Sequence, residues 1–180
     1  MTSPRRISVV GNSGSGKSTL ARRIAARLGV PHVELDAMFW GPAWTRAEPE
    51  RFRRQVASRC AADAWVVDGN YRPVIDTVWS RADTVVWLDL PRRVVMLQLL
   101  ERTLRRLVLR TPIWNGNREP WQTLARWDPE ESVLRWAWTQ HAAYVSRYER
   151  AMSDPANARL AFHRLRSHAD AERLLATLTQ

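Results

Sequence analysis

The sequence predicts an α/β fold in which a five-stranded parallel sheet carries helices on both faces. Short β-branched or continuously apolar runs, typical of strands in such a sheet, recur along the chain. Segments with helical periodicity separate these runs, and no internal repeat or low-complexity linker interrupts the alternation. Because 180 residues are enough to bury one hydrophobic core, we expect a single domain over the whole chain.

The predicted elements follow one another as expected for βαβ units. Five strands are predicted, at residues 5–11, 32–36, 64–69, 84–90 and 160–165. Helices are predicted at residues 18–29, 49–63 and 169–178. In the first helix Leu20, Ile24 and Leu28 form one apolar stripe, and Gly29 follows, as glycine often does where a helix ends.

A long helical insertion, at about residues 91–150, separates the last two strands, and we expect its lid-like part at about 100–130. The apolar side of its first helix consists of Val94, Leu97, Leu100, Leu104 and Leu107. The opposite side carries Arg102, Arg106 and Arg110, so we expect this arginine face to point away from the core.

A second helix of the insertion is expected at about residues 130–150, after the helix-breaking segment TPIWNGNREPW (111–121). Its apolar stripe consists of Leu134, Trp138, His141, Val145 and Tyr148. Trp136 lies on another side, so the helix has two apolar sides. We expect it to pack on the body of the domain and to contact a mobile element or a partner as well.

The composition limits the class of protein. Cys60 is the single cysteine, which excludes an internal disulfide, and it shares a helix face with Phe52 and Val56, so we expect it to be buried. The chain begins without a signal-peptide pattern and contains no run of 18 apolar residues. We therefore expect a cytoplasmic protein that does not contact a membrane.

The net charge of +10 suits a protein that binds nucleic acid, a membrane surface or a substrate with several phosphates. The basic residues are spread along the chain without a dense tail, which disfavours the first two classes. No cluster of His, Cys and carboxylates has the spacing of metal ligands, so a structural zinc is not expected. His141 is interpreted as a packing residue.

One motif predicts a nucleotide site. The segment GNSGSGKST (11–19) matches G-x-x-x-x-G-K-[ST] and lies between a predicted strand and a predicted helix, the context of a phosphate-binding loop. Lys17, the only lysine in the chain, is expected to contact the β- and γ-phosphates of ATP, and the Ser18 hydroxyl to bind Mg²⁺. The predicted nucleotide-binding residues are Gly11, Asn12, Ser13, Gly14, Ser15, Gly16, Lys17, Ser18 and Thr19.

The segment VVDGNYR (66–72) resembles the D-G-F-P-R segment of adenylate kinases, although Asn70 and Tyr71 replace Phe and Pro. The resemblance implies that Asp68 lies near the Mg²⁺ and that Arg72 binds the anionic group of the phosphate acceptor. From the residues alone, a carboxylate at the end of a strand beside the phosphate loop can hold metal hydration or orient a nucleophile. A turn at Asp68 is the alternative.

Two further segments are similar to parts of small-molecule kinases. LDAMFWGPAW (35–44) resembles the region in which shikimate kinase places an Asp against the acceptor hydroxyl, so Asp36 is a candidate general base, with helix N-capping as the alternative. Trp40 and Trp44 either line an acceptor pocket or pack in the core. ERTLRR (101–106) resembles the start of the adenylate kinase lid.

The lid resemblance implies that Arg102 stacks on adenine and that Arg106 clamps a phosphate, with a solvated helix face as the alternative. Together these segments and NGNREPW (115–121) resemble the adenylate-kinase-related P-loop proteins often labelled DNA-topology-modulation proteins, over most of residues 5–168. In that group Arg118 corresponds to an arginine that meets the transferred phosphoryl group, and Arg166 lies where relatives hold adenine.

The resemblance implies a three-layer P-loop fold and an ATP–Mg²⁺-dependent phosphotransferase that acts on a small acceptor, with a nucleoside monophosphate as one candidate. In that hypothesis Asp36 or Asp68 orients the nucleophile and lid arginines stabilise the transferred charge. The alternative hypothesis is a nucleotide-dependent DNA- or RNA-binding module with ATPase activity that affects DNA topology. The D-G-x-x-R segment and the scattered basic residues favour the kinase.

Overall fold

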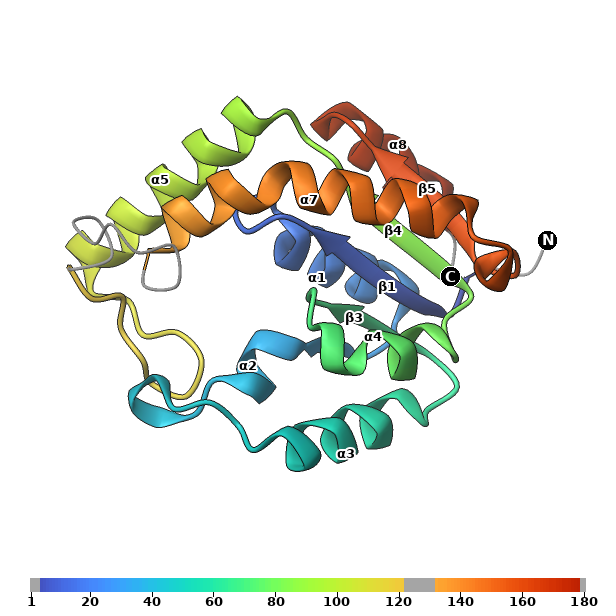
Figure 1. Cartoon of the computed structure of the whole chain (residues 1–180), viewed down its shortest axis with the longest axis horizontal. Helices are drawn as coiled ribbons and strands as arrows, with labels where there is room; N and C mark the ends of the chain where they lie inside the picture. Colours follow the sequence, from blue (N-terminus) through green and yellow to red (C-terminus); the bar gives the residue numbers. More distant parts are fainter. Residues whose placement is uncertain (1–3, 122–131, 179–180) are drawn as a thin grey trace.

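The computed structural model describes residues 4–121 and 132–178 and contains one five-stranded parallel sheet (Figure 1). The strands are β1 (Arg6–Gly11), β2 (His32–Glu34), β3 (Trp65–Asp68), β4 (Thr84–Leu88) and β5 (Ala161–Leu165). Their order is β2-β3-β1-β4-β5, so β1 lies at the centre and pairs with β3 and β4. The predicted fold class is confirmed.

Helices cover both faces of the sheet and complete a three-layer structure (Figure 1). They are α1 (Lys17–Leu28), α2 (Leu35–Phe39), η1 (Pro42–Trp44), α3 (Pro49–Cys60), α4 (Arg72–Trp79), α5 (Arg92–Leu109), α7 (Val133–Ser153), η2 (Pro155–Asn157) and α8 (His168–Thr177). α1 and α8 pack on the face that buries Ile7 and Val9, whereas α3, α4 and α7 pack on the face that buries Val10 and Trp87. Both faces are covered, which explains the continuously apolar strands.

The observed element boundaries differ from the predicted ones by up to three residues. The strand predicted at 32–36 ends at Glu34, because Asp36 already belongs to the first turn of α2. The helix predicted at 49–63 ends at Cys60. The first difference matters for function, because Asp36 lies on a short helix beyond the sheet edge and not at the end of a strand.

The helix α4 was missing from the predicted elements. It spans only eight residues and contains Pro73, a residue that interrupts helices except in their first turn, where Pro73 lies. Its sequence signal is therefore weak, but Val74 and Val78 are buried in the core of the sheet face that α3 also covers. The packing of these side chains stabilises a helix that local propensity alone does not indicate.

The prediction that the arginine face of α5 points away from the core was wrong. The buried residues of this helix are Val95, Leu99, Thr103 and Leu107. Three of the five residues on the predicted apolar side are exposed, namely Leu97, Leu100 and Leu104. Arg102 and Arg106 are partly buried, whereas Arg110 is exposed where the helix ends. Apolar residues occupy every side of α5, so periodicity alone did not identify the buried stripe.

The helix predicted at 130–150 is α7, which begins at Val133; residues 130 and 131 lie outside the described part of the chain. It packs against the sheet through Tyr148 and against α5, while Trp136 and Trp138 are exposed. His141 is a packing residue, as predicted, and its Nε2 lies 3.1 Å from the backbone oxygen of Leu90.

Cys60, the last residue of α3, is buried in the same hydrophobic cluster as Phe52 and Val56, as predicted. Burial raises the pKa of its thiol to about 11, which leaves the side chain uncharged and poorly reactive at neutral pH. None of the helices in the described ranges is long and apolar enough to cross a membrane.

The backbone at Gly14 sets a steric limit that can be tested. Its φ is +85°, and an added Cβ would lie 2.6 Å from the Cβ of Leu99 and 2.9 Å from the carbonyl oxygen of Val95. We expect Gly14→Ala to lower the free energy of unfolding by about 2–5 kcal/mol, since left-handed strain and overpacking combine. Urea unfolding measures this change.

Gly29→Ala is the matched control, because Gly29 also has a positive φ, of +65°, but open space around it. Its loss should stay at about 1–2 kcal/mol, the left-handed strain alone. Equal losses in the two variants would show that α5 does not pack against the loop as described.

Candidate active site

The segment between β1 and α1 has the backbone of a phosphate-binding loop. Gly11, Gly14 and Gly16 adopt φ values of 150°, 85° and 88°, which side chains disfavour. Lys17 is the first residue of α1, and no side chain caps this helix N-terminus. Its uncapped N–H groups and positive dipole end suit an anionic ligand.

Two asparagines hold the loop in place. The Asn12 amide donates to the backbone oxygen of Ala137 on α7 at 2.7 Å, and its Oδ1 accepts from the Ser13 N–H at 2.8 Å. Asn70, at the end of β3, pairs with both the N–H and the carbonyl of Gly11 and accepts from the Tyr148 hydroxyl at 2.9 Å. The loop is thus tied to β3 and α7.

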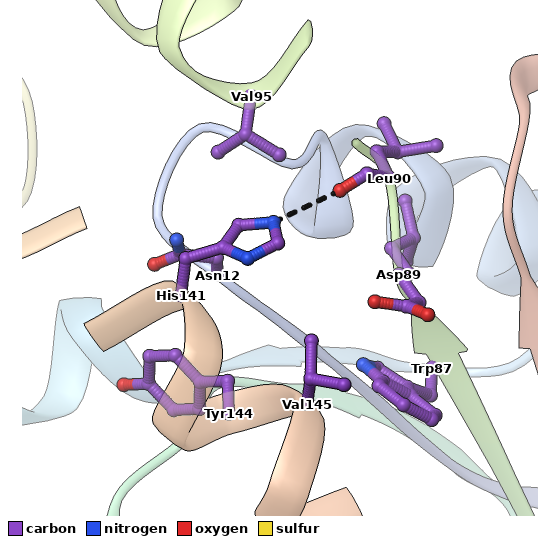
Figure 2. Close-up of a pocket in the computed structure, with 9 residues that line it drawn as sticks. Asn12, Trp87, Asp89, Leu90, Val95, His141, Tyr144 and Val145 are labelled. Atoms are coloured by element: carbon purple, nitrogen blue, oxygen red, sulfur yellow. Dashed lines mark hydrogen bonds between the residues drawn. The ribbon is translucent and has the colours of Figure 1, made fainter. Parts of the chain in front are cut away.

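The space behind the loop is closely packed. Figure 2 shows Asn12 beside His141, with Val95 of α5 and the end of β4 around them. The cavity that these residues line measures about 10 Å³, the lower limit for holding one water molecule. A ligand of the loop therefore has to bind on its outer side, toward the N-terminus of α1.

Asp68, Ser18 and His32 converge at the end of β3. Asp68 is only 1% exposed, and its Oδ2 accepts a hydrogen bond from the Ser18 hydroxyl. Its other oxygen lies 2.8 Å from Nε2 of His32 on the neighbouring strand β2. The structure therefore brings together the two residues predicted to bind the metal. Sequence reasoning missed His32, because its proximity to Asp68 follows only from the pairing of β2 with β3.

Asp36 lies in the first turn of α2 and is oriented by Tyr71. The Tyr71 hydroxyl donates to Asp36 Oδ1 at 2.6 Å. Burial, the Asp36 charge and this hydrogen bond all raise the pKa of Tyr71, so the hydroxyl remains a donor at neutral pH. The ring of Phe39 packs on that of Tyr71, with centroids 4.6 Å apart. A single carboxylate oxygen of Asp36 is thereby held in a fixed direction.

Residues 111–119 connect α5 to the α2–η1 region across the carboxyl edge of the sheet (Figure 1). Asn117 is 4% exposed; it accepts from the Trp44 N–H at 2.9 Å and donates to the Gly41 carbonyl at 2.9 Å. The Trp114 indole donates to Glu34 Oε1 at 2.8 Å. Of the predicted lid-like insertion, residues 122–130 lie outside the described part of the chain.

Arg102 and Arg106 extend from α5 toward this connecting segment. Arg106 Nη1 lies 3.7 Å from Glu119 Oε2, and its guanidinium lies 5.7 Å from the ring centre of Trp114. Burial, followed by the charge of Arg106, lowers the pKa of Arg102 to about 10, while Glu119 and Asp36 act in the opposite direction. Arg102 is therefore close enough to Arg106, Glu119 and Asp36 for their charges to act on it.

Other predicted site residues are placed less specifically. Arg118 has an exposed side chain and contributes its backbone oxygen to the Trp44 indole, 3.1 Å away. The ring of Trp44 also packs edge to face on that of Trp40. Arg72, at the start of α4, is exposed, as is Arg166, whose backbone N–H donates to an Asp170 carboxylate that caps α8. Thr19 is exposed on α1.

No family model matches the chain. A bifunctional pantoate ligase/cytidylate kinase of Gloeobacter violaceus is 36% identical over 83 residues, which are 46% of this chain and 15% of that protein. An uncharacterized Bacillus subtilis protein, YqaC, is 28% identical over 104 residues, 57% of this chain and 58% of that protein. The chain thus matches less than two thirds of the length of either relative.

Solved structures share the fold over nearly the whole chain. A gluconokinase from Sinorhizobium meliloti has a TM-score of 0.51 at 20% identity and covers 98% of this chain and 94% of its own. A sugar kinase from Janibacter sp. has a TM-score of 0.52 at 19% identity, and the match covers 96% of this chain and 92% of the sugar kinase. A shikimate kinase from Bacteroides thetaiotaomicron has a TM-score of 0.51 at 16% identity, and the match covers 96% of this chain and 97% of the shikimate kinase. At these identities the likeness shows the fold alone, and the narrower resemblance to DNA-topology-modulation proteins stays a prediction.

The buried amide of Asn117 should control the attachment of residues 111–119. In Asn117→Ala the Trp44 N–H and the Gly41 carbonyl lose their partner, so we expect a loss of about 1–3 kcal/mol in the free energy of unfolding. Hydrogen exchange at the Trp44 amide should accelerate. Asn157→Ala, which removes one amide contact to Ala151 elsewhere, is the control and should leave Trp44 protected. Continued protection in Asn117→Ala would contradict the attachment.

Proposed function

We propose that this protein is an ATP–Mg²⁺-dependent phosphotransferase that transfers the γ-phosphoryl group to a small acceptor. The observation that carries the proposal is that two groups of residues, proposed here as half-sites, follow the carboxyl ends of parallel strands in one sheet. One is the phosphate loop with the Ser18–Asp68 contact, and the other is Asp36, held by Tyr71. The shared fold with a gluconokinase and a shikimate kinase, and the local identity to a bifunctional pantoate ligase/cytidylate kinase, support the same reaction class.

In the nucleotide half-site, Lys17 and the N–H groups that start α1 bind the phosphates of ATP. The glycines give the loop a backbone that carries few obstructing side chains, and α5 fixes its rear side through Gly14. The Lys17 side chain is partly exposed and makes no hydrogen bond to another described residue, so its ammonium is available to the ligand. Arg166 is proposed to lie beside the adenine, on the loop between β5 and α8.

Ser18 and Asp68 fit a magnesium ion. A hydroxyl and one carboxylate are hard oxygen ligands, and Mg²⁺ in phosphotransferases takes most of its remaining ligands from phosphates and water. No group of three or more His, Cys, Asp or Glu residues within the described ranges could hold a metal by itself, which agrees with a metal that binds together with the nucleotide. When bound, Mg²⁺ neutralises the charge on the phosphates. His32 fixes the orientation of the Asp68 carboxylate.

In the acceptor half-site, Asp36 orients the attacking hydroxyl and accepts its proton. Tyr71 occupies Oδ1, which leaves Oδ2 for the acceptor. Trp40 and Trp44 supply an apolar wall beside it, and Arg72 is a candidate contact for the acceptor's far end. Arg118 lies on the segment that crosses the sheet edge, where it is proposed to meet the transferred phosphoryl group. Catalysis then rests on positioning and charge neutralisation.

Removal of the Lys17 ammonium tests the nucleotide half-site. We expect Lys17→Ala to reduce phosphoryl transfer at least about 100-fold, as the loss of a group that stabilises transition-state charge does, with little change in unfolding. Labelled ATP and a panel of hydroxyl metabolites and nucleoside monophosphates measure transfer. Arg22→Ala, which removes an exposed cation from the same helix, should transfer at the parent rate. Turnover that appears only when DNA is added would instead favour the nucleic-acid-binding module.

The two aspartates should differ in what they control. Asp68→Asn should raise the Mg²⁺ concentration required for half-maximal transfer by about 10- to 100-fold, because the Ser18 and His32 contacts converge on it. Asp36→Asn should lower kcat by about 100- to 10,000-fold without changing the Mg²⁺ requirement. Asp76→Asn, an exposed carboxylate on α4, should change neither. Identical profiles for the first two variants would refute the division of roles.

A further inference from the structure

Arg102 combines burial with an unused hydrogen-bonding group. Its Nε is shielded from solvent and has no hydrogen-bond partner, and the guanidinium forms no ion pair with another described residue. A buried N–H without a partner costs free energy, so natural proteins rarely keep one that serves no purpose. The cost at Arg102 is larger than for a neutral group, because a positive charge is removed from water.

A second cation increases this cost. Arg106, one helical turn further along α5, is near enough for its charge to lower the pKa of Arg102 further. At a pKa of about 10, Arg102 nevertheless remains protonated at neutral pH. Two guanidinium groups are therefore held close together in a partly desolvated position, where an anion bound beside them would relieve the repulsion.

The neighbouring acidic groups do not fill this role. Glu119 is 9% exposed in its side chain, but it contacts Arg106 and not Arg102, at the long distance of 3.7 Å. Asp36 interacts with the charge of Arg102 but forms no ion pair with it. The hydrogen-bond partner of Asp36 is the Tyr71 hydroxyl. Arg106 is also oriented by the Trp114 ring. Arg106 is thus positioned by Glu119 and Trp114, whereas the guanidinium of Arg102 has no partner among the described residues.

The structure assigns Arg102 and Arg106 to an anion-binding subsite for the phosphate acceptor, beside the carboxylate that orients its hydroxyl. This inference rests on the proposed function and names the substrate class: a small molecule that carries both a hydroxyl and an anionic group. Carboxylates and phosphate monoesters offer the oxygen acceptors that a guanidinium fork pairs with. An acceptor of this class would span the distance from Asp36 to α5 with its two ends.

The subsite replaces the adenine contact that the lid resemblance implies for Arg102. An adenine is uncharged, so stacking on it would leave the repulsion between Arg102 and Arg106 uncompensated. An anion beside the two guanidinium groups compensates their charge.

Binding measurements with three related probes test the subsite. Glycerol 3-phosphate and glycerate carry a hydroxyl with a phosphate or a carboxylate, and glycerol carries hydroxyls alone. Titration calorimetry is carried out with the phosphate loop saturated by a non-hydrolysable ATP analogue and Mg²⁺, so that the loop cannot bind the probes. We expect at least one anionic probe to bind and glycerol not to bind; which of the two binds more tightly identifies the anionic group.

Arg102→Gln should weaken binding of that probe at least tenfold and leave the Kd of the ATP analogue within twofold. Arg105→Gln removes an exposed charge from the same helix and should change neither. Urea unfolding adds a second readout: without ligand, Arg102→Gln should be as stable as the parent or more stable, because a desolvated cation is lost. A purely structural arginine would give a loss of stability instead.

Several outcomes overturn the subsite: neither anionic probe binds the parent, Arg102→Gln binds the probe as tightly as the parent, or Arg102→Gln weakens the ATP analogue and spares the probe. These results are independent of turnover. Arg102-dependent probe binding in a protein that transfers no phosphoryl group would refute the proposed function and leave the subsite. Transfer that Arg102→Gln does not affect would refute the subsite and leave the proposed function.

Discussion

The shape of the phosphate loop depends on the contacts behind it, because a loop that offers its own N–H groups to a ligand cannot use them to hold itself. Asn70 takes over this task by pairing with both backbone groups of Gly11, as a neighbouring strand would. Asn12, the next residue of the loop, hydrogen-bonds to α7. Gly14 lies against α5 without room for a side chain. The loop therefore has one conformation only as long as α5 and α7 remain packed against each other and against the loop.

The same arrangement couples the two half-sites. α5 contacts the phosphate loop near its start, carries Arg102 and Arg106 further along, and continues into residues 111–119, which are attached to η1 through Asn117. Tyr71 follows Asn70 directly in the chain, so one short segment after β3 contacts both the loop and Asp36. The two proposed half-sites are thus connected through packed elements and not through a flexible linker. This connection is what a reaction between two bound substrates requires.

The sequence predicted what local pattern and motif determine, and failed where distant contacts decide. The five strands, the phosphate loop and the closeness of Ser18 to Asp68 follow from apolar runs and a motif with fixed geometry. The partner of Asn12 lies 125 positions away in the chain, and the contact of His32 with Asp68 needs the strand register. On α5, leucines on all sides concealed that an arginine-bearing side is partly buried. No local signal separates a leucine that covers the core from one that faces solvent.

The chain uses arginine almost everywhere and lysine once, and the contacts suggest a physical basis for the difference. Within residues 4–121 and 132–178, guanidinium groups lie over tryptophan rings at three places: Arg92 over Trp138, Arg106 over Trp114 and Arg164 over Trp87, at 4.9, 5.7 and 4.4 Å. A planar, weakly hydrated guanidinium suits such stacking and can also pair with carboxylates, as Arg164 does with Asp89. At the start of α1 the demand is opposite. In the proposed function, a slim ammonium on a flexible stem reaches beneath the phosphates, where a wide fork would displace the loop, so arginine would be the poorer choice at position 17.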